Sequence, residues 1–154
     1  MGLDMYLYCN SKELSEKVAD AMYREDNFQY KLAVQRGEIG YWRKQSQIHN
    51  WFVTNIQNGI DDCHRYNVDW EDLADLLKVL EEVLETRNKD ILPLVDGFFF
   101  NVNDDDDDSW YWNGIYYTYK LIKTILYNVY IENGECFEDE TKQWRVSFFY
   151  VSSW

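Results

Sequence analysis

The residues with the clearest capacity for chemistry are five consecutive aspartates between two aromatic clusters: Asp104, Asp105, Asp106, Asp107 and Asp108. Phe98–Phe100 precede this aspartate run, and Trp110 and Trp112 follow it. A carboxylate run of this kind can bind a metal ion or contact a basic surface. Because aromatic side chains dominate the binding energy of many interfaces, we expect the aspartate run to bind a partner with Trp110 and Trp112 as anchors. A solvated loop that keeps an aromatic region soluble is the plainer alternative.

The aspartate run does not form a calcium loop of the helix-loop-helix type. Such a loop needs glycine at its sixth position and glutamate at its twelfth. Counted from Asn101, Asp105 matches the fifth, ligating position, but the sixth and twelfth positions hold Asp106 and Trp112. A looser calcium site stays open, but we predict no metal and no cofactor for this chain.

A second acidic surface is expected on the solvent side of a helix that begins near residue 70. Glu71, Asp75 and Glu82 lie on this side. Carboxylates one turn apart are separated by about 5.4 Å along a helix, which is comparable to the spacing of phosphates on a nucleic-acid strand. A folded acidic protein can therefore imitate nucleic acid and occupy a basic groove. The alternative is an ordinary solvated face, with Lys78 and Arg87 as partial counter-charges.

One segment concentrates basic, aromatic and imidazole groups within this acidic chain. It contains Tyr41, Trp42, Arg43, Lys44 and His49. The two cations can bind phosphate or carboxylate, the rings can stack on a base, and His49 can transfer protons near neutral pH. We expect a helix from about Tyr41, which would align Trp42, His49 and Ile56. This pocket for a small anionic ligand, such as a nucleotide signal, is our alternative to the acidic surface; a purely structural role for Arg43 and His49 also stays open.

The remaining chemical groups give little support for catalysis. Asp61, Asp62, Cys63 and His64 are consecutive, and adjacent side chains rarely face one another as a nucleophile and base must. With two histidines in the chain, a histidine-rich metal site is excluded. The sequence contains no phosphate-binding glycine loop, no nucleophile elbow and no zinc-binding helix motif. We predict no catalytic residues; whether an activity exists stays open, and a binding role is favoured.

Composition limits where the protein acts and what it binds. The chain has 154 residues, a formal net charge of −13 and 46% hydrophobic residues. It is therefore long and apolar enough to fold as one domain, residues 1–154, but its charge opposes direct binding to nucleic acid. No stretch approaches the ~20 apolar residues of a membrane helix, and no leader segment is visible at the N-terminus. Three scattered cysteines do not suggest a disulfide framework, so we expect a cytoplasmic protein.

Hydrophobic periodicity predicts the elements that must position these groups. We expect strands at about residues 3–9, 66–68, 129–131 and 143–151, and helices at about 12–22, 41–57, 70–84 and 110–128. Ser11, Asp69 and Ser109 are the expected helix caps, and Asn133-Gly134 is the expected hairpin turn between the last two strands. Residues 27–36 fit either a strand or a helix. The sum is an α+β fold with three to four helices packed on a small, mainly antiparallel sheet.

Several strings of the sequence resemble a family of small proteins encoded by phages and prophages. They are Met1–Tyr8, Glu38–Lys44, Ile48–Val53, Asp61–Cys63, Leu92–Pro93, Gly97–Phe100 and Tyr150–Trp154. The resemblance covers most of the chain in order. It implies a phage accessory protein in the cytoplasm of the bacterial host that acts by binding, for example by inhibiting a host defence protein with a basic, nucleic-acid-handling surface. An oligomer with an assembly role is a further possibility.

Overall fold

The computed structural model describes residues 2–22, 34–95, 108–133 and 146–154, with the backbone alone for residues 130–133. The strands are β1 (Asp4–Cys9), β2 (Glu38–Arg43), β3 (Tyr66–Val68) and β4 (Phe148–Ser153). The α-helices are α1 (Lys12–Met22), α3 (Ser46–Asn55), α4 (Trp70–Thr86) and α5 (Ser109–Asn133), and η1 (Lys89–Ile91) is a short 3-10 helix. Among the described residues, no helix is both long enough and apolar enough to cross a membrane.

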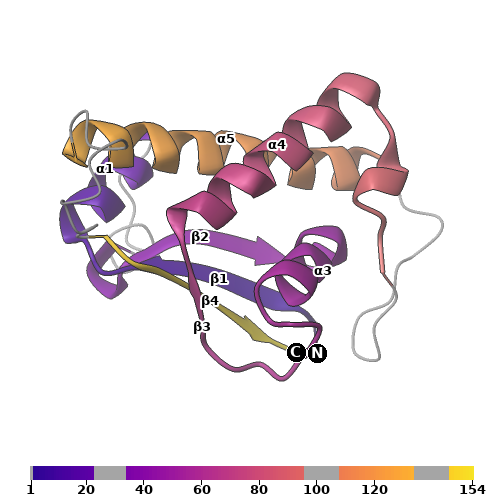
Figure 1. Cartoon of the computed structure of the whole chain (residues 1–154), viewed down its shortest axis with the longest axis horizontal. Coiled ribbons are helices and arrows are strands. Elements are labelled where there is room, and N and C mark those ends of the chain that lie inside the picture. Colours follow the sequence, from indigo (N-terminus) through magenta and orange to yellow (C-terminus); the bar gives the residue numbers. More distant parts are fainter. Residues whose placement is uncertain (1, 23–33, 96–107, 134–145) are drawn as a thin grey trace.

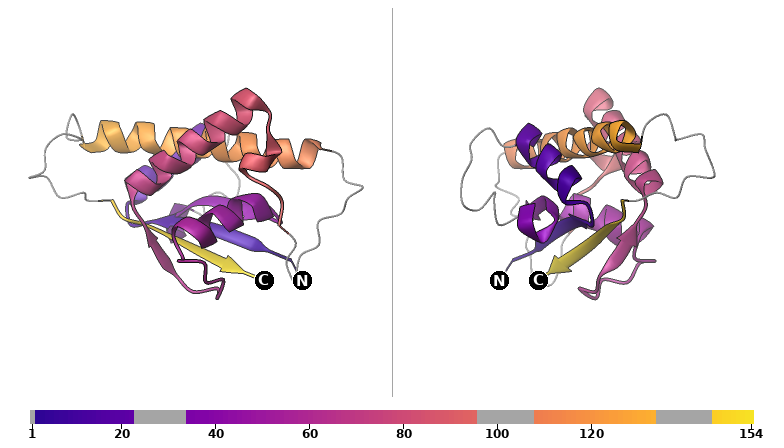
Figure 2. Two further views of the ribbon diagram at one scale, coloured as in Figure 1. Left: turned by 45° about the vertical axis from the view of Figure 1, so that its right-hand side comes forward. Right: turned by 90° about the vertical axis from the view of Figure 1, so that its left-hand side faces the viewer.

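The four strands form one antiparallel sheet in the order β2-β1-β4-β3. Strand β1 is central, and its Leu7 lies opposite Gly40 on one side and Tyr150 on the other. The long helices α4 and α5 lie across one face of this sheet (Figure 1; Figure 2). The prediction of an α+β fold with a small antiparallel sheet is confirmed.

Local sequence signals correctly located the starts of two helices. The backbone N–H of Leu14 donates to the Ser11 hydroxyl at 3.1 Å, which caps α1. The backbone N–H of Asp69 donates to the Asp72 carboxylate at 2.9 Å at the start of α4. Both bonds satisfy backbone donors that a helix start would otherwise leave unpaired.

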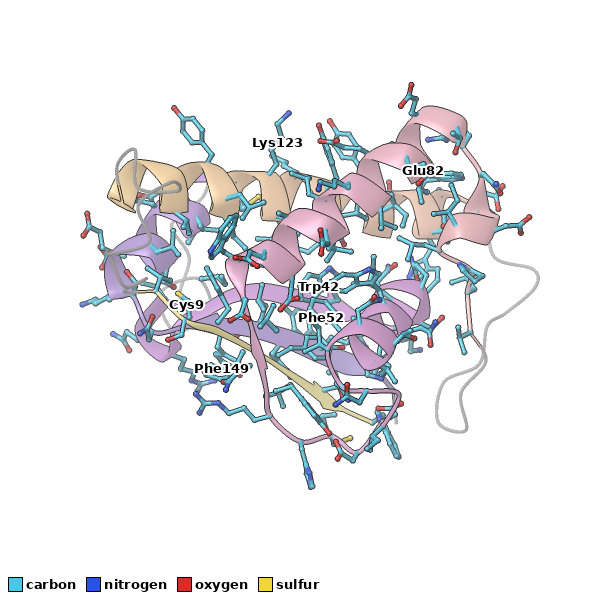
Figure 3. All side chains as sticks on the ribbon, viewed as in Figure 1. Cys9, Trp42, Phe52, Glu82, Lys123 and Phe149 are labelled. Atoms are coloured by element: carbon cyan, nitrogen blue, oxygen red, sulfur yellow. The ribbon has the colours of Figure 1, made fainter. Side chains whose placement is uncertain are left out.

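The core lies between the sheet and the helices and is rich in aromatic rings. The rings of Phe52 on α3 and Tyr150 on β4 stack with centroids 4.0 Å apart and planes 6° apart. Trp42 on β2 packs beside them, with its ring centroid 6.1 Å from that of Phe52 (Figure 3). The predicted alternation of β1 is confirmed, because Leu3, Met5, Leu7 and Cys9 are buried on this side.

The opposite face of the sheet carries a continuous row of stacked groups. The Arg65 guanidinium lies 3.4 Å above the Phe149 ring, and Phe149 stacks on Tyr8 at 5.0 Å. Tyr8 contacts Tyr6 at 6.0 Å, and Tyr6 contacts Tyr41 at 5.3 Å. Because the rings pack against one another, they shield apolar surface on a face that no described helix covers.

Two predicted elements are wrong. Residues Tyr41–Arg43 belong to strand β2 rather than to a helix, because their backbone pairs with β1; Lys44 then turns the chain with a φ of 56°, and α3 starts at Ser46. Residues 129–131 continue helix α5 rather than forming a strand. Ile125 and Val129, four positions apart, are both fully buried, so the helical period extends beyond the expected end. Strand β4 pairs instead with β1 and β3.

Some of the expected local structure falls outside the described residues. This holds for Gly134 of the expected Asn133-Gly134 turn and for residues 143–145 of the expected last strand. It also holds for residues 27–33 of the segment that fits either a strand or a helix, whereas its described residues 34–36 are helical.

Candidate functional site

A pocket of about 310 Å³ lies between strand β2 and the N-terminal half of helix α5. Its lining residues are Tyr41, Trp42, Arg43, Gln45, Trp110, Asn113, Gly114 and Tyr117. It therefore unites three residues predicted for the ligand pocket with Trp110, which was predicted for the acidic surface. The α5 residues recur at spacings of three and four, which places them on one side of the helix.

Two aromatic side chains of the pocket are fixed by hydrogen bonds. Trp42 is only 2% exposed, and its indole N–H donates to the Thr118 hydroxyl at 2.8 Å. Tyr41 is 39% exposed, and its hydroxyl donates to the Asp4 carboxylate at 2.6 Å. This bond is the main cause that raises the pKa of Tyr41 to about 12, so Tyr41 stays neutral at physiological pH. The Trp42 indole is therefore held rigidly at the pocket, whereas the Tyr41 ring packs on Tyr6 at 5.3 Å in the row on the opposite face of the sheet.

The carboxamide of Gln45 is held tightly at the pocket. Gln45 is 8% exposed, and its Oε1 accepts a hydrogen bond from Gln47 Nε2 at 2.6 Å. A Cβ atom at Gly114 would lie 1.8 Å from Gln45 Oε1 and 2.7 Å from its Nε2. Glycine at this position of α5 therefore makes the space that the Gln45 carboxamide occupies.

Arg43 is the only charged residue among the described residues that line the pocket. Its strand partner is Asp4, but the Asp4 carboxylate already accepts a hydrogen bond from Tyr41. Within the described part of the chain, Arg43 forms no ion pair with a carboxylate. An exposed guanidinium with five donors is suited to a phosphate or carboxylate ligand.

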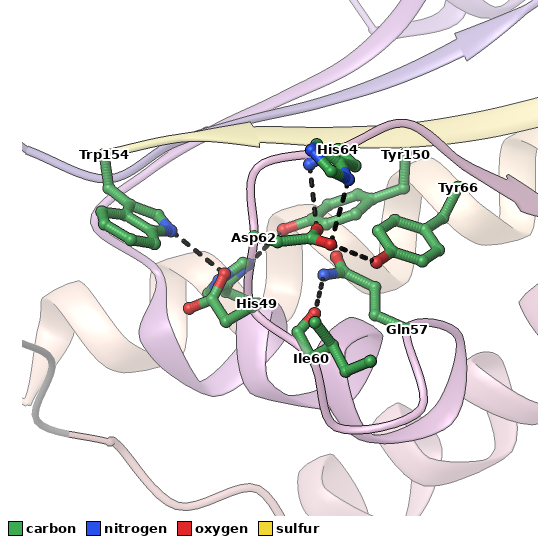
Figure 4. A network of polar contacts seen from close by, with 9 residues as sticks. His49, Gln57, Ile60, Asp62, His64, Tyr66, Tyr150 and Trp154 are labelled. Atoms are coloured by element: carbon green, nitrogen blue, oxygen red, sulfur yellow. Dashed lines mark hydrogen bonds and ion pairs between the residues drawn. The ribbon is translucent and has the colours of Figure 1, made fainter.

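Lys44 and His49, which were also predicted for the ligand pocket, do not line it. His49 is 2% exposed; its Nδ1 lies 2.6 Å from the Tyr150 hydroxyl and its Nε2 lies 3.0 Å from Asp61 Oδ1. Trp154 Nε1 donates to the same Asp61 oxygen at 3.0 Å (Figure 4). The expected alignment of Trp42 with His49 is wrong, because a strand end and a turn separate them.

The surroundings of His49 set its protonation state. Burial lowers the pKa of His49 below its ordinary value of 6.5, and the Asp61 carboxylate opposes this shift. Burial also raises the pKa of Tyr150 well above 10. Tyr150 is therefore a neutral donor to Nδ1, and the neutral imidazole donates from Nε2 to Asp61. This network ties helix α3 to the following loop and to the C-terminal strand.

The segment Asp61–His64 is a tightly bonded turn. The Asp62 carboxylate accepts hydrogen bonds from the His64 backbone N–H at 3.1 Å and from the Tyr66 hydroxyl at 2.8 Å. The His64 imidazole also lies 3.1 Å from Asp62, so it pairs with this carboxylate. In the residues that the structure describes, no three His, Cys, Asp or Glu side chains gather as a metal site would require.

Only one member of the aspartate run belongs to the described residues. Asp108 is described, and it forms an ion pair with Lys89. The other four lie outside the described residues, so their part in a partner surface stays a prediction: Asp104, Asp105, Asp106 and Asp107.

The acidic helix face and the two tryptophan anchors are described. Glu71, Asp75 and Glu82 are exposed on helix α4 (Glu82 is labelled in Figure 3). Arg87, at the end of α4, lies 3.6 Å above the ring of Trp112. Trp112 therefore packs against the end of α4, whereas Trp110 lines the pocket. The two expected anchors lie in different environments.

Sequence reasoning missed four of the residues that line the pocket. They are Gln45, Asn113, Gly114 and Tyr117. The pattern Trp110-Asn113-Gly114-Tyr117 was a usable signal, because a small residue and an amide between aromatics on one helix side is unusual for a core stripe. This pattern did not indicate that strand β2 packs against this side of the helix.

Comparisons with known proteins leave the function to be argued from the site. The chain matches no protein-family model, no curated protein and no solved structure.

Proposed function

We propose that the protein binds a small anionic ligand in the pocket between β2 and α5. The observation that supports this function best is the convergence of Tyr41, Trp42 and Arg43 from β2 with Trp110 from α5 on one concavity of about 310 Å³. Ligand pockets are mostly apolar clefts of about 300–1,000 Å³ with a few well-placed polar groups. This pocket lies at the small end of that range, which favours a small molecule over a peptide.

The proposed role is binding rather than turnover. No carboxylate, imidazole or thiol is among the described residues that line the pocket. The neutral His49 is held by Tyr150 and Asp61 and is not at the pocket. A general acid or base has to reach the reacting atoms within hydrogen-bonding distance. Sequestration of a ligand, such as a signal molecule, is therefore favoured over its conversion.

The charge of the protein makes Arg43 the decisive group. The formal net charge of −13 repels anions at long range, so a local cation has to supply the attraction. Arg43→Ala should therefore abolish anion binding. Arg65→Ala is the matched control, because it also removes one arginine charge, but from a side chain that stacks on Phe149.

The first experiment is a thermal-shift screen of small organic anions, followed by calorimetric titration of each hit. A ligand at 100 times its dissociation constant stabilises the folded state by ~2.7 kcal/mol, which such a screen detects. Binding by the wild type and by Arg65→Ala, with loss in Arg43→Ala, is the expected pattern. Equal binding by Arg43→Ala would place the ligand elsewhere and refute the proposal.

We propose a second candidate function, the binding of a basic partner, which is supported by the exposed carboxylates of α4 and by an aspartate that lies just beyond the end of this helix. Asp108 pairs with Lys89 immediately after α4, and α4 itself exposes Glu71, Asp75 and Glu82. In this proposal the partner is a bacterial host defence protein with a basic surface, as the resemblance to phage-encoded proteins suggests. Acidic surfaces of this kind accelerate association and make it salt-dependent.

Capture of host proteins from bacterial lysate at low and high salt tests the second candidate. Glu71→Gln/Glu82→Gln removes two charges from α4, and the control Glu13→Gln/Glu16→Gln removes two charges from α1. A basic partner should be retained at low salt, released at high salt and weakened by the α4 variant alone. Equal loss in both variants would show that net charge, rather than the α4 surface, governs binding.

A further inference from the structure

We infer that the pocket takes a mononucleotide, with its base against Trp110 and its phosphate at Arg43. This inference rests on the proposed ligand-binding function and narrows it to one chemical class. Three properties of the pocket lead to it: its aromatic walls, its excess of hydrogen-bond donors, and its single positive charge at one end.

The aromatic walls are suited to a flat ring. The Tyr41 hydroxyl is committed to Asp4 and the Tyr41 ring packs on Tyr6, so the surface for a flat ring comes from helix α5. Trp110 and Tyr117 are partly buried on the facing helix. Trp42 forms a T-shaped contact with Tyr117, with centroids 6.1 Å apart and planes 80° apart, which fixes the floor. Bases of any kind stack on such aromatic surfaces.

The polar groups that stay available are mainly donors. Gln45 Oε1 is occupied by Gln47, and within the described chain no hydrogen bond engages Gln45 Nε2. Arg43 contributes only hydrogen-bond donors, and the Trp42 indole N–H already donates a hydrogen bond to Thr118. The complementary ligand is therefore rich in acceptors, as a base carbonyl or ring nitrogen and a phosphate are.

The arrangement of these groups gives the ligand a direction. Arg43 is the last residue of β2, and Gln45 follows two residues later, directly before α3. Asn113 lies on α5 on the other side of the pocket and can donate or accept. If the phosphate binds Arg43, the edge of the base can form hydrogen bonds with the side-chain amides of Gln45 and Asn113. Side-chain amides recognise the edges of bases in this way in nucleic-acid complexes. The volume of about 310 Å³ lies at the lower end of the range for small-molecule sites, which suits a single nucleotide.

Calorimetric titration with four groups of probes tests this inference. The probes are the monophosphates AMP, GMP, CMP and UMP, the corresponding nucleosides, inorganic phosphate, and phenyl phosphate as an aromatic anion without a base. At least one monophosphate should bind tenfold or more tightly than its nucleoside, than phosphate and than phenyl phosphate. Equal binding of phenyl phosphate and the best monophosphate would refute base recognition.

The variant Gln45→Glu tests the donor assignment. It keeps the length of the side chain but replaces the free N–H donors with a carboxylate, so binding of the best monophosphate should weaken at least tenfold. Asn67→Asp adds the same charge at an exposed position of β3 and should leave binding within twofold. If Gln45→Glu is not folded by circular dichroism, Asn113→Asp provides the same test at an exposed residue that lines the pocket, because it replaces amide donors with a carboxylate.

The outcomes separate this inference from the function on which it rests. If phenyl phosphate or another organic anion binds in an Arg43-dependent manner and no mononucleotide does, the pocket is an anion site and the nucleotide assignment is wrong. If no probe binds and the thermal-shift screen finds no anion, the proposed function fails as well. Unchanged nucleotide affinity in Gln45→Glu would also overturn the assignment of the base edge.

Discussion

The most demanding test of the pocket architecture is the substitution Gly114→Ala. The added Cβ would lie 1.8 Å from Oε1, 2.3 Å from Cδ and 2.7 Å from Nε2 of Gln45. Carbon atoms do not approach so closely, so the carboxamide has to move and its 2.6 Å hydrogen bond with Gln47 has to break. Gln47 is 1% exposed, and its Oε1 already has no partner among the described residues. The substitution therefore leaves a second buried polar atom of Gln47 unpaired.

The expected magnitude follows from two opposing effects. Leaving a buried amide donor unpaired costs about 1–3 kcal/mol. Replacing glycine by alanine inside a helix recovers about 0.8–1.0 kcal/mol. Gly114→Ala should therefore lower the free energy of unfolding by about 0–2 kcal/mol, even though alanine is the better helix former.

A double-mutant cycle with Gln45→Ala isolates the steric effect. Without the Gln45 side chain there is nothing for the new Cβ to displace, so Gly114→Ala should then stabilise the protein by about 1 kcal/mol. Urea denaturation of the four proteins gives the coupling free energy, which should be about 1–3 kcal/mol. If Gly114→Ala has the same effect in both backgrounds, Gln45 does not occupy this space and the described pocket geometry is wrong.

Two further predictions concern other parts of the fold. Burial lowers the pKa of His49, so as the pH falls below about 6.5 the unfolded state binds a proton at His49 before the folded state does. The free energy of unfolding should therefore be highest above that pH and should decrease as the pH falls toward the pKa of the folded state. Urea denaturation between pH 7 and 5 should show a slope that His49→Gln removes and His64→Gln, at an exposed site, retains. Phe149→Ala should lower the free energy of unfolding by about 2–4 kcal/mol, because it removes a half-buried ring together with its stacking on Tyr8. Arg65→Ala should cost about 0.5–1 kcal/mol; if it costs as much as Phe149→Ala, the guanidinium rather than the ring row holds that face.

The sequence determined the elements whose signals are local. Strand β1 alternates apolar and polar residues with a period of two, and one face of it is buried as that period requires. The helices α1 and α4 begin where a side-chain oxygen can accept a backbone N–H within the same turn. These interactions span at most four residues, so they are present in the chain before any tertiary contact forms.

The tertiary structure decided the elements whose local signals were ambiguous. The segment Tyr41–Arg43 has apolar residues that fit either period, and pairing with β1, more than thirty residues away, makes it a strand. Residues 129–131 are β-branched and aromatic, but the burial of Val129 on the same side as Ile125 keeps them in α5. Tertiary packing outweighs a difference in intrinsic propensity that is only about 0.7 kcal/mol per residue.

The pocket could not be derived from the sequence for the same physical reason. Tyr41, Trp42 and Arg43 were recognised as suited to an anionic ligand, but their complement on α5 lies about seventy residues later in the chain. No local interaction links the two segments; the bond from the Trp42 indole to Thr118 forms only when α5 packs over the sheet. The residue types thus determined which functional groups are present in the chain. The packing of α5 against β2 decided which of these groups lie together in one site.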